Sequence, residues 1–282
     1  MVRVSSDVLL VSCIVPVFNA SRFLRHALAS MLDQRYAPIE IVVADDGSDD
    51  DSVDIARSHG DRVRVVAQRG LGPAATRNLG ARAARGTFLA FLDPDDLWHP
   101  DKLELQMQCL RDDPRLDFCV THVQMFWEAA VADEGERLKG HSRATEPVPG
   151  FSATTLLVRR TAFDRVGPFD PGLWFADAVD WFMRAEAAGL RHRLLPDVLT
   201  YHRMHESNLT RRRDRDSRAE FLRVVKAWAD RRQAATTASG RDDQPRPLEK
   251  LPGDVRPEGA CLHPSPARRA ETGPQALVGD QT

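Results

Sequence analysis

Two acidic clusters contain the side chains best suited to chemistry. The first is Asp45-Asp46-Gly47-Ser48, and the second is Asp93-Pro94-Asp95-Asp96, directly after the apolar run Phe88–Leu92. Carboxylates such as Asp45 and Asp46 can accept hydrogen bonds from a nucleobase imide or from ribose hydroxyls. A turn with a helix cap explains the first cluster at least as well. The second cluster favours function, because three carboxylates after an apolar strand need neutralising, and a hard divalent cation on Asp93 and Asp95 would do so while bridging a diphosphate.

Three further groups of residues could take part in the same chemistry. Gly70–Pro73 precedes a helix containing Arg77 and Asn78, which could contact phosphates, although helix surface and capping explain them equally well and no P-loop pattern is present. Asp177 and Asp180 are three residues apart on one predicted helix face, where either could act as a general base or belong to a solvated acidic face. His205 follows Arg203 and could be a further metal ligand, although a lone histidine is more often structural.

Alternating strand and helix patterns must position these residues. We predict an α/β fold with a mixed, mainly parallel sheet, helices on both faces and a Rossmann-like N-terminal half. Ligands of such sheets bind beyond the carboxyl ends of the strands, where Asn19, Asp45, Asp46, Asp93 and Asp95 all fall. The predicted strands are 9–17, 39–44, 62–67, 87–93, 117–126, 153–158, 191–195 and 198–203, and the predicted helices are 20–34, 48–59, 74–85, 101–110, 177–189 and 214–232.

We predict one domain over residues 1–232, in which 128–150 forms a polar loop. The last helix should pack through one side formed by Phe221, Leu222, Val225 and Trp228. Residues 233–282 are rich in proline and arginine, with almost no aromatic residues, and should be disordered and dispensable for folding.

Composition excludes several classes of function. The net charge of −2 gives no support for a nucleic-acid partner, and no apolar run reaches the ~18 residues of a membrane helix. The four cysteines form no CxxC pair, so we expect free buried thiols at Cys13 and Cys119 in a reducing cytoplasm. Peripheral contact with the inner face of the membrane stays open, and the oligomeric state is unassigned.

Four stretches, in order and at matching separations, resemble the family 2 glycosyltransferases, which are inverting enzymes with the GT-A fold. They are VSCIVPVFN (11–19), IEIVVADDGSDD (39–50), GPAATRNLGARAARG (72–86) and FLDPDDLWHPDKLE (91–104), and the likeness extends over roughly residues 9–210. The resemblance implies a nucleotide-sugar donor, often a uridine diphosphate sugar, an unidentified glycan, lipid-linked or peptide acceptor, and Mn²⁺ or Mg²⁺.

The resemblance also implies individual roles. Phe18, with Pro16 and Asn19 beside it, matches the wall against the nucleotide base, and Asp46, with Asp45, matches the carboxylate that binds the base. Asp93 and Asp95 resemble the DxD motif, in which Asp95 ligates the metal and Asp93 lies near the ribose or metal, while His205 resembles a late histidine beside the metal.

The catalytic base departs from the family pattern. Many members carry Glu-Asp at the start of the helix that begins here with Asp177-Ala178, so Ala178 takes the position of the base. Asp177 or Asp180 then becomes the candidate base. This departure leaves open a non-catalytic nucleotide-sugar-binding protein. A nucleotidyltransferase is a further alternative, although the glycine-rich basic motif expected after its first strand is missing from residues 19–25.

Overall fold

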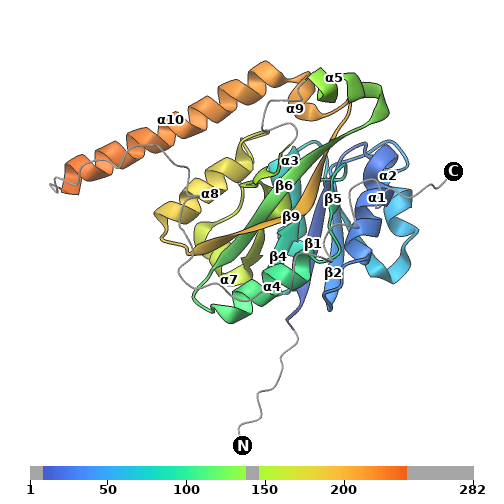
Figure 1. The fold of residues 1–282 in the computed structure, drawn as a ribbon, viewed down its shortest axis with the longest axis horizontal. Helices are drawn as coiled ribbons and strands as arrows, with labels where there is room; N and C mark the ends of the chain where they lie inside the picture. The colour runs from blue at the N-terminus through green and yellow to red at the C-terminus, as the bar shows by residue number, and fades with distance from the viewer. Residues whose placement is uncertain (1–8, 138–145, 240–282) are drawn as a thin grey trace, which may run out of the picture.

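One twisted sheet positions all of the candidate residues. The computed structural model describes residues 9–137 and 146–239. Nine strands in these residues pair in the order β3-β2-β1-β4-β8-β6-β9-β5, and β7 pairs with β6 at the side. β1 (Val11–Val17) is parallel to β2 (Ile39–Asp45) and to β4 (Phe88–Phe91), and β2 is parallel to β3 (Val63–Ala67). The predicted Rossmann-like N-terminal half and mixed sheet are therefore confirmed (Figure 1).

The second half of the chain adds mostly antiparallel pairs to this sheet. β8 (Leu157–Arg159) lies antiparallel between β4 and β6 (Phe118–Trp127), and β6 runs parallel to β9 (His192–Met204). β9 also pairs with the short β5 (Leu97–Trp98), and β7 (Val148–Pro149) pairs with β6. The two strands predicted over 191–203 are thus one strand, and the register shifts opposite residues 121–123 accommodate Pro196 within it.

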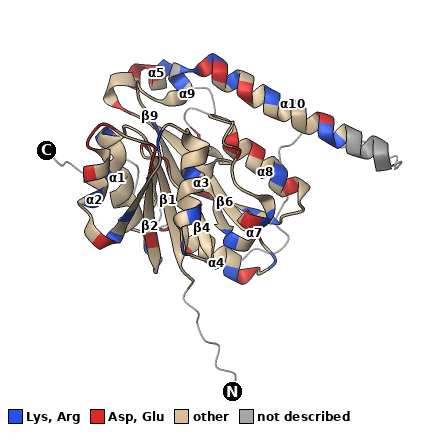
Figure 2. Ribbon diagram, turned by 180° about the vertical axis from the view of Figure 1, so that it is seen from behind, with Lys and Arg blue, Asp and Glu red and all other residues tan. Residues whose placement is uncertain are grey.

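Helices cover both faces because the buried strands are apolar on both sides. Val11, Cys13 and Val15 of β1 pack with α1 (Ser21–Leu32) and α4 (Lys102–Asp112). Ile14 faces the opposite side, where α3 (Pro73–Ala83), α7 (Arg160–Val166) and α8 (Asp177–Ala187) pack. Figure 2 shows α3 lying across that face of the sheet. Gly80 allows this close approach, since a Cβ there would lie 2.4 Å from Cγ2 of Ile14.

Some predicted boundaries are wrong at short elements. The helix predicted from residue 48 is α2 (Ser52–Arg57), preceded by Asp51, so Ser48 and Asp49 do not cap it. Residues 153–155 form the 3₁₀ turn η3, so the strand predicted over 153–158 begins only at Leu157 and ends at Arg159. A second 3₁₀ turn, η1 (Gly60–Arg62), precedes β3. The predicted loop 128–150 contains η2 (Ala129–Val131), α5 (Ala132–Arg137) and β7, while residues 138–145 lie outside the described residues. Short elements of this kind carry too few residues for a periodic pattern.

The C-terminal helix differs most from its prediction. After the short α9 (Leu209–Arg212), α10 (Asp214–Ser239) continues seven residues past the predicted boundary at 232, since no glycine or proline interrupts it before Gly240. The helix passes α8 and extends beyond the rest of the molecule (Figure 1). Residues 240–282 of the predicted tail lie outside the described residues.

The predicted apolar side of α10 is also wrong, because Phe221 and Leu222 are 47% and 65% exposed. Val224 is the buried residue instead, against Leu173 and Ala176. No helix in the described ranges is long and apolar enough to cross a membrane. Cys13 and Cys119 are free and buried as predicted, and so is Cys109.

Candidate functional site

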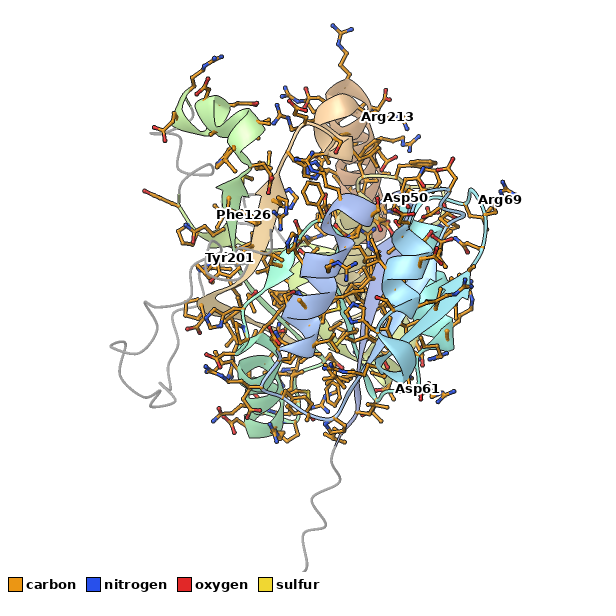
Figure 3. All side chains as sticks on the ribbon, turned by 90° about the vertical axis from the view of Figure 1, so that its right-hand side faces the viewer. Asp50, Asp61, Arg69, Phe126, Tyr201 and Arg213 are labelled. Atoms are coloured by element: carbon orange, nitrogen blue, oxygen red, sulfur yellow. The ribbon has the colours of Figure 1, made fainter. Side chains whose placement is uncertain are left out.

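The candidate residues gather at one end of the sheet because parallel strands end together. Val17 at the end of β1 pairs with Asp45 at the end of β2, and the N–H of Leu92 after β4 bonds to the carbonyl of Ile14 in β1. Figure 3 shows this end, with Asp50 and Arg69 at the top and Asp61, which precedes β3, at the opposite end of the molecule. Both acidic clusters therefore flank the carboxyl end of β1, as predicted.

Arg77 joins two of the carboxylates predicted for the site. Its Nη1 lies 2.6 Å from Oδ2 of Asp177, and its Nη2 lies 2.6 Å from Oδ1 of Asp93. Arg77 and Asp177 are buried, whereas the side chain of Asp93 is 31% exposed. Burial raises the pKa of Asp177, and Arg77 offsets only part of this effect. An arginine of the chain itself thus pairs with one carboxylate of the second acidic cluster, Asp93, and with Asp177.

Asp95 is held by residues that follow β9. Its Oδ2 lies 3.0 Å from Nε2 of His205 and 3.3 Å from Nδ2 of Asn208. Nδ1 of His205 accepts a bond from the N–H of Ser207, so the Nε2–H of His205 donates to Asp95. Burial opposes ionisation, but the bond with His205 and the charge of His202 together lower the pKa of Asp95. The Asp95 side chain stays 25% exposed and ionised, with Oδ1 bonded to neither His205 nor Asn208.

The third carboxylate of this cluster serves the fold. Asp96 is fully buried, lies 2.9 Å from Nδ1 of His202 and accepts a bond from the backbone N–H of Arg203. The Asp96 carboxylate raises the pKa of His202 to about 9. Arg203 donates to the carbonyl of Asp95 and pairs with Glu128. These buried contacts attach β9 to the turn that carries Asp93 and Asp95.

The first acidic cluster organises two loops at the end of the sheet. Asp45 accepts bonds from the N–H groups of Gly47 and Ser48. Asp46 accepts them from the N–H groups of Leu71 and Gly72, at 3.0 and 2.8 Å. The Asp46 carboxylate is buried by these bonds and by Gln68 Nε2, so it shapes the loop before α3.

The end of β1 is tied to the same turn. Asn19 has a left-handed φ of 49°, receives the Asp49 N–H on its side chain and donates its own N–H to Ser48. Pro16 is buried within β1, whereas Phe18 is 61% exposed. An exposed aromatic ring beside a bonded turn suits a stacking role better than a packing role.

Two predicted residues have structural contacts that use their polar groups. Both ends of the Asn78 amide bond to the backbone of Phe169. Asp180 pairs with Nε of Arg184 at 2.7 Å, and Arg184 in turn bonds to the carbonyls of Val166 and Pro168. Of the two candidate bases, Asp177 is the one connected to the DxD pair, because Arg77 bonds to both Asp177 and Asp93.

Sequence reasoning missed residues that act from distant segments. Asn208 reaches Asp95, and Glu220 of α10 accepts bonds from the N–H groups just before α8. Trp174 packs near Gly72, where an added Cβ would lie 3.2 Å from the indole ring. No local pattern marks Glu220, since acidic residues are ordinary on an exposed helix.

The residues present fit a divalent cation that would be bound partly by protein carboxylates and partly by the diphosphate of a donor. Within the described residues, no group of three or more His, Cys, Asp or Glu side chains is arranged to hold a metal by itself. Magnesium-type sites in proteins commonly use one or two carboxylates plus substrate phosphates and water. Asp93 and Asp95, both partly exposed, supply that number of carboxylates.

Comparison with known proteins identifies the family. Residues 12–169 match the model of glycosyl transferase family 2. An uncharacterized glycosyltransferase of Rickettsia typhi is 30% identical over 220 residues, which is 71% of this chain and 66% of the relative. Another, from a Nostoc species, is 28% identical over 218 residues, 70% of this chain and 66% of its own length. The chain belongs to glycosyl transferase family 2, and it spans just under two thirds of these relatives.

Solved structures share its GT-A fold. TarS 1–349 of Staphylococcus aureus in complex with UDP-GlcNAc gives a TM-score of 0.61 at 20% identity over 78% of this chain and 66% of that solved chain. The mannosyltransferase PcManGT of Pyrobaculum calidifontis in complex with GDP-Man and Mn²⁺ gives 0.60 at 25% identity over 78% of this chain and 64% of the enzyme. The fold predicted from the sequence is confirmed.

Proposed function

We propose that the chain transfers a sugar from a nucleoside diphosphate donor to an acceptor hydroxyl, with a divalent cation at Asp93 and Asp95. The observation that carries this proposal is a pair of partly exposed carboxylates, Asp93 and Asp95, at the end of the sheet where β1, β2 and β4 finish. Arg77 bonds to Asp93, and His205 bonds to Asp95. Those two contacts fix the carboxylates before any ligand arrives, which reduces the reorganisation that binding requires.

The donor would lie between the two acidic clusters, at the carboxyl end of β1. The exposed ring of Phe18 is available for the base, and the loop held by Asp46 borders it. When bound, the cation would offset the charge that develops on the departing diphosphate. Arg77 carries a guanidinium beside Asp93 and could bond to a diphosphate oxygen in the same place.

Asp177 is our proposed base. Its raised pKa suits proton transfer near neutral pH better than an ordinary surface carboxylate. It would take the proton from the acceptor hydroxyl as that oxygen attacks the anomeric carbon, which inverts the stereochemistry. Asp180 has no comparable connection to the DxD pair.

The nucleotide is not selected by the fold, since TarS and PcManGT are complexed with UDP and GDP sugars respectively. A panel of nucleotide sugars, each incubated with the protein and Mn²⁺, tests the proposal through release of the nucleoside diphosphate. We expect turnover with one donor class, and a uridine donor is our first choice. Binding of donors with no release from any of them, even with mixed glycan acceptors, would support the non-catalytic alternative instead.

A further inference from the structure

Glu220 connects the protruding helix α10 to the segment in front of α8. Its side chain is only 11% exposed although it lies on a helix that is otherwise largely open to solvent. Its carboxylate accepts N–H bonds from three consecutive residues, namely Trp174 at 3.0 Å, Phe175 at 2.7 Å and Ala176 at 2.8 Å. One carboxylate from a segment about 45 residues away thus fixes this stretch of backbone.

The three N–H groups belong to the residues that lead directly into α8. Ala176, the last residue before the helix, has no side-chain acceptor of its own, so the acceptor for this stretch comes from another element. A negative charge at this end also complements the helix dipole. Glu220 supplies the acceptor atoms for residues 174–176 and adds its charge to those of Asp177 and Asp180 in the first turn.

The fixed stretch lies between two parts of the candidate site. At one end, Trp174 lies against Gly72, whose N–H bonds to Asp46. At the other end, Asp177 directly follows Ala176 and bonds to Arg77. Movement of residues 174–176 would therefore displace the proposed base and shift Trp174 relative to the loop bordering the donor, which Asp46 continues to hold.

The environment of Trp174 points to the acceptor. The indole is 43% exposed, and the guanidinium of Arg213 lies 5.6 Å from its ring centre. Arg213 lies at the same end of the molecule as Asp50 and Arg69 (Figure 3). An exposed, immobilised aromatic ring three residues from the proposed base is placed to contact whatever molecule delivers the attacking hydroxyl.

We propose that Glu220 is a positioning residue, which acts from α10 to hold Trp174 and Asp177 in register with the donor site; this rests on the function proposed above. α10 also contacts the body through Val224, which packs with Leu173 and Ala176, and through a 3.9 Å approach of Arg232 to Glu186. Both signs of charge alternate along it, as Figure 2 shows, and its outer apolar residues face solvent. Glu220 is the α10 residue that bonds to the segment between Gly72 and the proposed base.

The first test is hydrogen exchange of the backbone amides of residues 174–176. We expect Glu220→Ala to speed their exchange by about tenfold or more, while the strands of the sheet keep their protection. Glu220→Gln keeps the size and one acceptor oxygen, so it should give an intermediate rate and serves if the alanine variant does not fold. Asp230→Ala, an exposed carboxylate on the same helix, is the matched control and should leave the exchange unchanged.

The second test is kinetic and uses the donor that turns over. Glu220→Ala should lower kcat about tenfold with little change in the donor KM, because the base is displaced and the DxD pair is not. Glu220→Gln should recover part of the loss. Unchanged exchange at 174–176 in Glu220→Ala would overturn the proposal, and so would faster exchange with an unchanged kcat. Absence of turnover in the wild type would overturn the proposed function instead, and the exchange result would still decide whether Glu220 holds the segment.

Discussion

Nη1 of Arg77 lies 2.6 Å from Oδ2 of Asp177 and joins two segments 100 residues apart in the chain. The same guanidinium reaches Asp93, so a single buried cation is shared by two carboxylates that belong to different halves of the fold. The protein itself therefore supplies part of the positive charge that these carboxylates need. A bound cation would share Asp93 with Arg77 rather than fill an unbalanced site.

Removing Arg77 should destabilise the fold strongly. Arg77→Ala leaves Asp177 buried without its partner, and breaking a buried ion pair in this way typically costs about 3–5 kcal/mol. Urea unfolding at pH 7 measures the change in the free energy of unfolding. Arg82→Ala on the exposed side of the same helix is the control and should change it by no more than about 0.5 kcal/mol. Equal midpoints for the two variants would contradict the proposed balance of charge.

Substitution of Asp177 should lower kcat far more than substitution of Asp180. Asp177→Asn removes the proposed base and should lower kcat by about 10²–10⁴-fold with donor affinity retained. Asp180→Asn weakens only the bond with Arg184, so we expect nearly normal kcat and a loss of stability of about 1 kcal/mol. Single-turnover kinetics with the active donor measures the first effect, and thermal unfolding measures the second. A larger kcat loss in Asp180→Asn would reverse the assignment of the base.

Metal-dependent donor binding should depend on Asp95. Asp95→Asn retains the size of the side chain but removes the charge that attracts a cation, so calorimetry with Mn²⁺ should show at least about tenfold weaker donor binding. Chelation of the metal should weaken the wild type in the same way and leave the variant unaffected. Asp61→Asn, at the opposite end of the molecule in Figure 3, should behave as wild type. An unchanged donor affinity of the wild type after chelation would exclude a role for the cation in donor binding.

The histidine behind Asp95 should contribute less than the carboxylate itself. His205 donates to Oδ2 of Asp95, and its ring centre lies 4.5 Å from that of Phe23 with the two planes tilted by 49°. His205→Ala frees the carboxylate to rotate, and loss of an orienting partner of this kind typically weakens metal affinity by about 10–100-fold. Manganese titration followed by electron paramagnetic resonance measures the affinity without any need for turnover. An unchanged affinity would show that Asp95 needs no such support.

A buried lysine should make stability rise with pH. Lys102 is fully buried beside Gln106 and Trp98, and burial lowers its pKa from 10.5 to about 7, against the opposing effect of Cys13 and Cys119. Below pH 7 both folded and unfolded chains carry the proton, so the folded state bears the full cost. Between pH 7 and 10.5 only the unfolded chain retains the proton, and each pH unit therefore adds up to about 1.4 kcal/mol of stability.

The matched variant for this effect is Lys102→Met, which keeps the length of the side chain without a titrating group. Between pH 7 and 9 the wild type should gain about 2 kcal/mol relative to the variant, measured by urea unfolding at each pH. The variant should be the more stable at pH 7, although its gain is reduced because Gln106 loses its partner. Parallel pH profiles would show that Lys102 does not titrate in this range.

The strand-and-helix order of the first hundred residues could be predicted because each element carries a full period of its pattern. β1 is buried at every position and apolar at all but Ser12, as expected of a strand covered on both faces, and α1 repeats apolar residues every three or four positions. β5, α7 and η3 were missed or displaced because two to seven residues cannot show a period. Their structure comes from pairing with distant partners.

Residue types and order along the chain determined the fold, the family and the two carboxylate pairs at the ends of β2 and β4, since strand polarity alone brings those ends to one edge. Only the tertiary structure decided which charges meet. It pairs Arg77 with Asp93 and Asp177, assigns His205 and Asn208 to Asp95, and sets Glu220 of α10 at the start of α8. A charge pair depends on distance in space and on exclusion of water, and neither is encoded in local spacing.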